Sequence, residues 1–193
     1  MSDFLPSDYR IPSAKDGYMS FEQGENRFRV LDKAITGYRW FVTIRDENDK
    51  EISKPITVRM ETPIKMEEIE EDMPKHLWIM PVYNFNMKRI QVLVITQKGI
   101  QKSILALTRN AKWGSPENYN LVVTKQGEKL ATEYSLTPEP TDKDEEKLLE
   151  DVKKQYKAMN MDLTAMYSSE KYPYGGDPYA SNNEALVNTE LGE

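Results

Sequence analysis

The sequence predicts a mainly β fold, a small barrel with one helix before its last two strands. Between residues 76 and 134, two strand hairpins flank a single amphipathic segment, and turn residues separate them. The same stretch carries eight Lys and Arg but only three carboxylates, although the whole chain has a net charge of −6. Basic residues interleaved with aromatic ones on short strands are typical of a barrel that holds a polyanion.

The first 26 residues are polar and punctuated by Pro and Gly, which predicts an arm that packs on the barrel. Strand patterns begin at residue 27. After a bend near Gly37, alternation places Trp40 on the core face of a strand and Arg39, Phe41 and Arg45 on the opposite face. The expected strands span residues 27–34, 38–45, 54–60, 76–83, 89–95, 119–125 and 131–136.

Two helices are expected. The first covers about residues 97–109, with Thr96 as its cap. Its inward residues are Ile100, Ile104, Leu105 and Leu107. The second is an amphipathic helix within residues 141–167 that opens at Thr141. Its apolar face comprises Leu148, Val152, Tyr156 and Met159.

Strands, then a helix, then two strands is the order of an OB-fold, a five-stranded barrel with its helix between the third and fourth strands. One extra hairpin strand makes this an elaborated version, over residues 27–140. From residue 168 to residue 193 the composition turns to Tyr, Pro, Gly, Asn and acids, which predicts a disordered acidic tail.

Charge is distributed unevenly along the chain. Residues 1–140 hold 20 basic and 20 acidic side chains, so residues 141–193 carry the whole −6. Six of the acids in the first part lie between residues 61 and 72; without that run, the body is mildly basic. Such asymmetry predicts a basic body with an acidic loop and an acidic tail.

Other protein classes are disfavoured. The absence of cysteine excludes disulfides, thiolate catalysis and a zinc site built on Cys, and favours an intracellular setting. No stretch approaches the roughly 20 apolar residues that cross a bilayer, so no membrane contact is expected. His76 is the only histidine, and a structural role is favoured over catalysis. A divalent-metal site in the acidic run at 67–72 is the less favoured alternative to a solvated loop. We therefore expect no enzyme, no metal and no cofactor.

Basic and aromatic residues give the strongest functional signal. An aromatic ring stacks on any base, contributing roughly 1–3 kcal/mol per base, while Lys and Arg neutralise phosphates. A polar loop around Trp113 favours its exposure, although a place in the core is the alternative for any of the tryptophans. The candidate nucleic-acid-binding residues are Arg27, Arg29, Arg39, Phe41, Arg45, Trp78, Tyr83, Lys88, Arg89, Lys98, Lys102, Lys112 and Trp113.

Seven short motifs lie between residues 22 and 127. They read EQGENRFRV, GYRW, LW, KRIQV, ITQKGIQK, WGSPENYN and VTKQG. Together they resemble the single-stranded DNA-binding proteins of tailed bacteriophages, over about residues 4–140. The resemblance implies an OB-fold of the metal-free kind that coats single-stranded DNA during phage replication or recombination, in the cytoplasm of the infected host. Bacterial counterparts end in an acidic tail closed by phenylalanine, whereas this chain ends in Leu-Gly-Glu.

We therefore expect binding of single-stranded DNA with little sequence preference, without catalysis. The acidic tail is expected to compete with DNA for the groove or to recruit replication proteins. The alternative is a structural or adaptor protein that binds another protein through the barrel. A metal-dependent nuclease built on the acidic run is a distant third.

Overall fold

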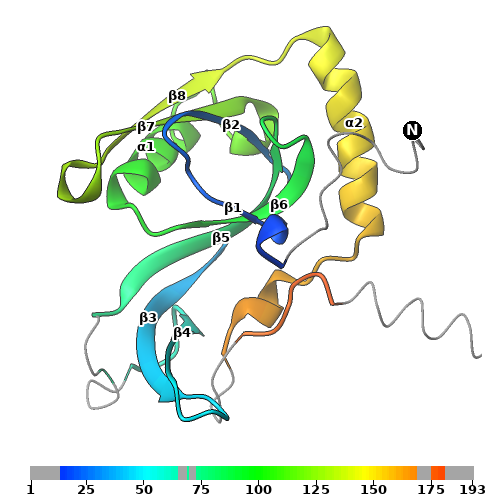
Figure 1. The fold of residues 1–193 in the computed structure, drawn as a ribbon. Helices are drawn as coiled ribbons and strands as arrows, with labels where there is room; N and C mark the ends of the chain where they lie inside the picture. The colour runs from blue at the N-terminus through cyan, green and yellow to red at the C-terminus, as the bar shows by residue number, and fades with distance from the viewer. Residues whose placement is uncertain (1–13, 65–68, 70–72, 169–174, 181–193) are drawn as a thin grey trace, which may run out of the picture.

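The structure is a computed structural model that describes residues 14–64, 69, 73–168 and 175–180. Its centre is one mixed sheet of eight strands, and two α-helices are described, so the predicted mainly β class is confirmed (Figure 1). The strands are β1 (Tyr18–Met19), β2 (Gly24–Val30), β3 (Ile35–Arg45), β4 (Glu51–Arg59), β5 (Lys75–Asn84), β6 (Arg89–Ile95), β7 (Asn120–Gln126) and β8 (Glu133–Glu139). The helices are α1 (Lys98–Thr108) and α2 (Lys143–Ala158), with short 3-10 turns η1 (Ala14–Gly17), η3 (Pro116–Asn118), η4 (Lys129–Ala131) and η5 (Leu163–Met166).

The sheet is open rather than closed into a barrel. Its order is β1-β6-β5-β2-β7-β8, and the β3–β4 hairpin branches from β5. β6 pairs in parallel with the short β1, through Tyr18↔Val92 and Met19↔Leu93. Within the described residues, β8 pairs only with β7. A closed barrel has no edge strands, so this sheet departs from the predicted barrel between β1 and β8.

β5 is the central strand, and both of its faces are covered. Its first half pairs with β3 and its last residues pair with β2, while β6 runs along its other side. Pro81, which has no N–H to donate, lies between the segments paired with β3 and with β2. Burial on both faces explains why this strand reads as a continuous apolar run instead of an alternating one.

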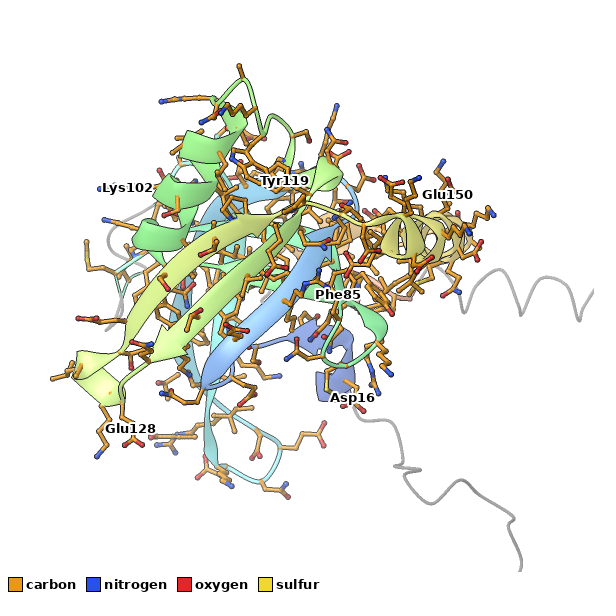
Figure 2. The ribbon with its side chains drawn as sticks, turned by 90° about the horizontal axis from the view of Figure 1, so that it is seen from above. Asp16, Phe85, Lys102, Tyr119, Glu128 and Glu150 are labelled. Carbon is orange, nitrogen blue, oxygen red and sulfur yellow. The ribbon has the colours of Figure 1, made fainter. Side chains whose placement is uncertain are left out.

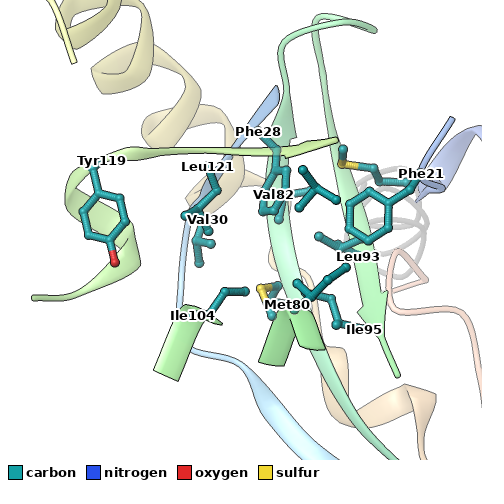
Figure 3. Close-up of a cluster of buried hydrophobic side chains, with 13 residues drawn as sticks. Phe21, Phe28, Val30, Met80, Val82, Leu93, Ile95, Ile104, Tyr119 and Leu121 are labelled. Atoms are coloured by element: carbon teal, nitrogen blue, oxygen red, sulfur yellow. The ribbon is translucent and has the colours of Figure 1, made fainter. Parts of the chain in front are cut away.

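The main core lies between the sheet and α1. Phe28 and Val30 of β2, Met80 and Val82 of β5, and Ile104 of α1 meet there, all at most 5% exposed (Figure 3). α1 begins at Lys98, with Gln97 at its N-cap and no side-chain cap, so the predicted capping by Thr96 is wrong. Leu105, predicted to face inward, is 39% exposed.

The face of the sheet away from α1, called the outer face below, is covered by α2 near β2 and β5. Leu149 and Val152 are buried there against Leu31 and Tyr83. The predicted apolar face is therefore partly wrong, because Leu148 is 43% exposed. The helix is capped by the side chain of Asp142, which accepts a hydrogen bond from the backbone N–H of Glu145, rather than by Thr141.

The C-terminal segment also packs on the outer face. Leu163 and Met166 join Leu77, Ile79 and Val92 in a second cluster, which Tyr179 borders. Residues 175–180, predicted to belong to a disordered tail, are therefore docked on the body. Residues 169–174 and 181–193 of the predicted tail, and residues 1–13 of the predicted arm, lie outside the described residues.

Several strand boundaries differ from the prediction. β3 covers 35–45 rather than 38–45, and β4 covers 51–59 rather than 54–60. β2 begins at Gly24, so the end of the predicted arm belongs to the sheet. β8 covers 133–139 rather than 131–136 because η4 occupies 129–131. Pro138, expected to end the body, sits inside β8 opposite Leu121. An edge strand tolerates proline because one of its sides needs no backbone donors.

Candidate nucleic-acid interface

A groove with a cavity volume of about 440 Å³ lies over β6, beside the opening between β1 and β8. It is lined by three consecutive residues of β6, by the N-terminal segment around β1, and by side chains from β3, β5 and β8. Those that carry chemistry are Tyr18, Phe21, Arg39, Phe41, Lys75, Thr96, Gln97 and Tyr134. The opening of the sheet therefore coincides with a groove that mixes aromatic and basic groups.

The aromatic rings of the groove differ in their freedom. Phe21 is buried and contacts Tyr134 of β8 at a ring-centroid distance of 6.0 Å, which links the two edges of the sheet. Tyr18 and Phe41 are 36% and 44% exposed. Exposed rings on strands can stack on bases without unfolding the core. Tyr18 and Phe41 therefore suit stacking, whereas Phe21 belongs to the core.

Arg39 is the arginine that lines the groove. Its Nε donates to Thr57 Oγ1 at 2.8 Å, and it forms no ion pair with any described residue. Burial lowers the pKa of Arg39, while the Tyr18 hydroxyl acts in the opposite direction. A half-buried guanidinium without a carboxylate partner leaves its terminal N–H groups available to an anion.

Further cations lie near Arg39. Lys75 stands directly opposite Arg39 in the β3–β5 register and also lines the groove. At the other end, Gln97 lines the groove and is followed by Lys98, the first residue of α1. Lys102 projects from α1 on the side of the molecule opposite Glu150 of α2 (Figure 2). The exposed lysines of α1 thus extend the basic character beyond the groove.

Arg27, Arg29 and Tyr83, predicted to bind DNA, lie instead on the outer face beside α2. Arg27 forms ion pairs with Glu139 at 2.7 Å and with Glu145 at 2.6 Å. Its guanidinium stacks over a phenylalanine, and its hydrogen bond to Glu145 is the main cause that raises its pKa. Tyr83 is buried under the helix. β2 and β3 are separate strands, so these arginines do not continue the basic face of β3.

Arg29 is 4% exposed and held by neutral groups. Its Nε donates to Asn120 Oδ1 at 2.9 Å, its Nη1 donates to the carbonyl of Glu117 at 3.2 Å, and its Nη2 donates to Thr141 Oγ1. Burial lowers its pKa to about 10, although Glu145 acts in the opposite direction. Its donors are engaged within the protein, which indicates that it fastens the start of α2 to the sheet.

The other predicted residues are scattered. Arg45 pairs with Asp49 and Glu51 at the tip of the β3–β4 hairpin, and Arg89 lies 3.9 Å from a carboxylate oxygen of Asp16. Lys88 is exposed in the β5–β6 turn and Lys112 in the loop after α1. Trp78 and Trp113 are half-buried against the main core, and Trp113 contacts Tyr119 edge-on at 5.0 Å.

Of the predicted residues, Arg39 and Phe41 line the groove. Sequence reasoning missed Tyr18, Lys75 and Tyr134. Tyr18 falls in the predicted arm, and Tyr134 alternates with polar residues in an ordinary edge strand. Lys75 becomes a candidate binding residue only through the strand register that sets it opposite Arg39. For Lys75, the one signal available in the sequence was a basic residue directly before the strand predicted at 76–83.

Within the described ranges, no group of three or more His, Asp or Glu side chains is placed to hold a metal ion. The acidic run at 67–72, considered as a metal site, lies outside the described residues except for Ile69. Over the described part of the chain, neither α-helix has the length and apolar character of a membrane span.

Comparisons with protein-family models, with curated proteins and with solved structures found no match to this chain. The resemblance of its short motifs to phage single-stranded DNA-binding proteins therefore stays a prediction.

Proposed function

We propose that the groove over β6 binds single-stranded DNA with little sequence preference. The observation that carries this proposal is that Arg39 and two exposed rings, Tyr18 and Phe41, line one groove. Phosphates of the strand would be neutralised by Arg39 and Lys75, and bases would stack on the rings. The proposal includes no catalytic step and no cofactor.

The strand pairing supports an elaborated OB-fold as the scaffold. β2, β5, β6, β7 and β8 supply five strands, with α1 between β6 and β7. OB-folds are partly open barrels that bind oligonucleotides on the face of strands 2 and 3, between the loops that follow strands 1 and 4. Here strands 2 and 3 would be β5 and β6. The β3–β4 hairpin would be the first of those loops, and the β7–β8 turn the second.

The motif resemblance adds a setting to this proposal. On its basis the proposed setting is phage DNA replication or recombination in the cytoplasm of the host, with replication proteins as proposed partners of the acidic C-terminal tail. In the adaptor alternative, the same scaffold binds a protein partner. The test below distinguishes this alternative from binding of single-stranded DNA.

The test is a titration of a labelled single-stranded oligonucleotide and of its duplex, followed by fluorescence anisotropy over a range of salt concentrations. For single strands, affinity falls with salt by a log–log slope of about −0.7 per phosphate neutralised, so three to five contacts give roughly −2 to −3.5. We expect such a slope and weaker binding of the duplex. Affinity independent of salt, or equal for the duplex, would overturn the proposal, and failure to bind either DNA would favour the protein-partner alternative.

A matched pair of variants locates the binding. Phe41→Ala should weaken binding of the single strand by roughly 5- to 150-fold, the loss that corresponds to one stacked base. Met87→Ala is the control, since Met87 is 49% exposed in the β5–β6 turn and does not line the groove. Equal affinities of the two variants would place the bound strand away from β3.

A further inference from the structure

A second, smaller cavity of about 240 Å³ adjoins the groove. It is lined by Tyr18 and Arg39, which also line the groove, by Pro55 and Thr57 of β4, and by Met166, Gly175 and Gly176 of the C-terminal segment. A water molecule occupies about 30 Å³ in the liquid, so this cavity has room for a small hydrated anion. The shared residues make the two cavities parts of one surface.

Arg39 is the arginine that lines this cavity. Arg27, Arg45 and Arg89 each have a carboxylate partner, whereas Arg39 has none among the described residues. Among the residues that the structure describes, its one hydrogen bond runs from Nε to Thr57 Oγ1. A guanidinium with free terminal N–H groups, held in one place by a buried hydroxyl, matches the geometry of a phosphate oxygen pair.

The C-terminal segment fixes the wall that faces Arg39. The backbone N–H of Ser168 donates to the carbonyl of Thr57 at 2.7 Å, and the Thr57 N–H donates to Ser168 Oγ at 3.1 Å. Tyr167 donates from its hydroxyl to the carbonyl of Thr36 at 2.8 Å, and Arg59 stacks over its ring at 4.6 Å. These contacts join the segment to both strands of the β3–β4 hairpin. They fix the backbone of Thr57, whose hydroxyl in turn accepts the hydrogen bond of Arg39.

We propose that this smaller cavity is a phosphate subsite of the groove, in which Arg39 binds one phosphate of the single strand whose bases lie against Phe41. The inference rests on the proposed function and goes beyond it by assigning one phosphate to one residue. It also gives the C-terminal segment a part in binding, as the wall that positions Arg39. Asp177 supplies an opposing charge beside the cavity, because it directly follows the lining residue Gly176 and because burial and, secondly, its charge raise the pKa of Tyr18, although Asp177 itself lines neither cavity.

The experiment repeats the salt titration with Arg39→Gln, Arg45→Gln and Asp177→Asn. Arg39→Gln should bind roughly ten-fold more weakly at low salt, the loss expected for a charge-assisted hydrogen bond, and its slope should be shallower by about 0.7. Arg45→Gln is the control on the same strand, because Arg45 lines neither cavity and already pairs with two carboxylates. Asp177→Asn should bind more tightly at low salt and keep the wild-type slope.

The outcomes separate the two proposals. If the wild-type protein fails to bind single strands, the proposed function itself is overturned. If it binds with a normal slope but Arg39→Gln keeps both the affinity and the slope, then only the phosphate subsite is overturned. Thermal melts of all variants verify folding. Should Arg39→Gln melt early, the Asp177→Asn variant decides, because an unchanged affinity at low salt contradicts a phosphate in this cavity.

Discussion

Shortening the C-terminus at two points should have two different effects. A chain ending at residue 180 loses residues 181–193, which carry three carboxylates and no basic residue. A chain ending at residue 168 also loses the docked residues 175–180. Of these, Pro178 is buried, and Tyr179 donates a hydrogen bond to the carbonyl of Gly17 and borders the cluster around Leu77.

The magnitude follows from Tyr179. Its hydrogen bond contributes about 0.5–1.5 kcal/mol, and partial burial of its ring contributes about 1 kcal/mol more. A loss of roughly 2 kcal/mol lowers the melting temperature of a chain of this size by about 4–8 °C. Thermal melts followed by circular dichroism measure this shift. The chain ending at residue 180 should melt like the full-length protein and bind single strands more tightly at low salt, since fewer tethered anions compete with phosphate.

Two results would refute this reasoning. If the chain ending at residue 168 melts like the full-length protein, the segment 175–180 is not docked as the structure shows. If the chain ending at residue 180 binds single strands with unchanged affinity at low salt, the last 13 residues do not compete for the groove. Their role would then be confined to partners or solubility.

Three further predictions concern single residues. Trp40→Ala should lower the free energy of unfolding by roughly 3–5 kcal/mol because Trp40 is 4% exposed. Phe41→Ala should leave the melting temperature almost unchanged. If Phe41→Ala melts early and Trp40→Ala does not, the buried and exposed faces of β3 have been assigned the wrong way round. Gly175→Ala should destabilise the protein by about 1–3 kcal/mol, since the added Cβ would lie 2.1 Å from a backbone oxygen. Gly176→Ala is the control, because its Cβ would make only ordinary contacts. Equal melting temperatures of the two variants would contradict this. Glu145 has its pKa lowered, chiefly by its hydrogen bond to an arginine, so its contribution is present at neutral pH and is lost as acid protonates the folded carboxyl. Glu145→Gln should therefore lower the melting temperature at pH 7 and converge with wild type in acid; a constant difference across pH would exclude this pair as the cause.

Local patterns predicted most of the elements of this fold. Period-two alternation located the strands of the 76–134 region within two or three residues, because their apolar faces pack in the core. The opposite faces of Trp40 and Phe41 were also predictable, since a strand exposes alternate residues. The residues around Arg39 and Phe41 therefore belong to what sequence reasoning located.

Contacts distant in sequence were not predictable. Arg27 reads as a basic surface residue, yet Glu139 and Glu145, more than one hundred residues away, pair with it. The tail composition predicted disorder, but Tyr179 and Pro178 find a partner surface on the outer face of the sheet. The opening between β1 and β8 likewise depends on β1, whose two residues carry no strand signal by themselves.

The central claim, that a single strand lies in the groove over β6, is tested most directly by photo-crosslinking. Oligonucleotides carrying 5-iodouracil would be irradiated with the full-length protein, and the crosslinked residues would be identified by mass spectrometry. We expect crosslinks at Tyr18, Phe41 or Tyr134, the rings that line the groove apart from the buried Phe21. Crosslinks confined to Tyr156 on α2 or to Trp113 in the loop after α1 would contradict this placement.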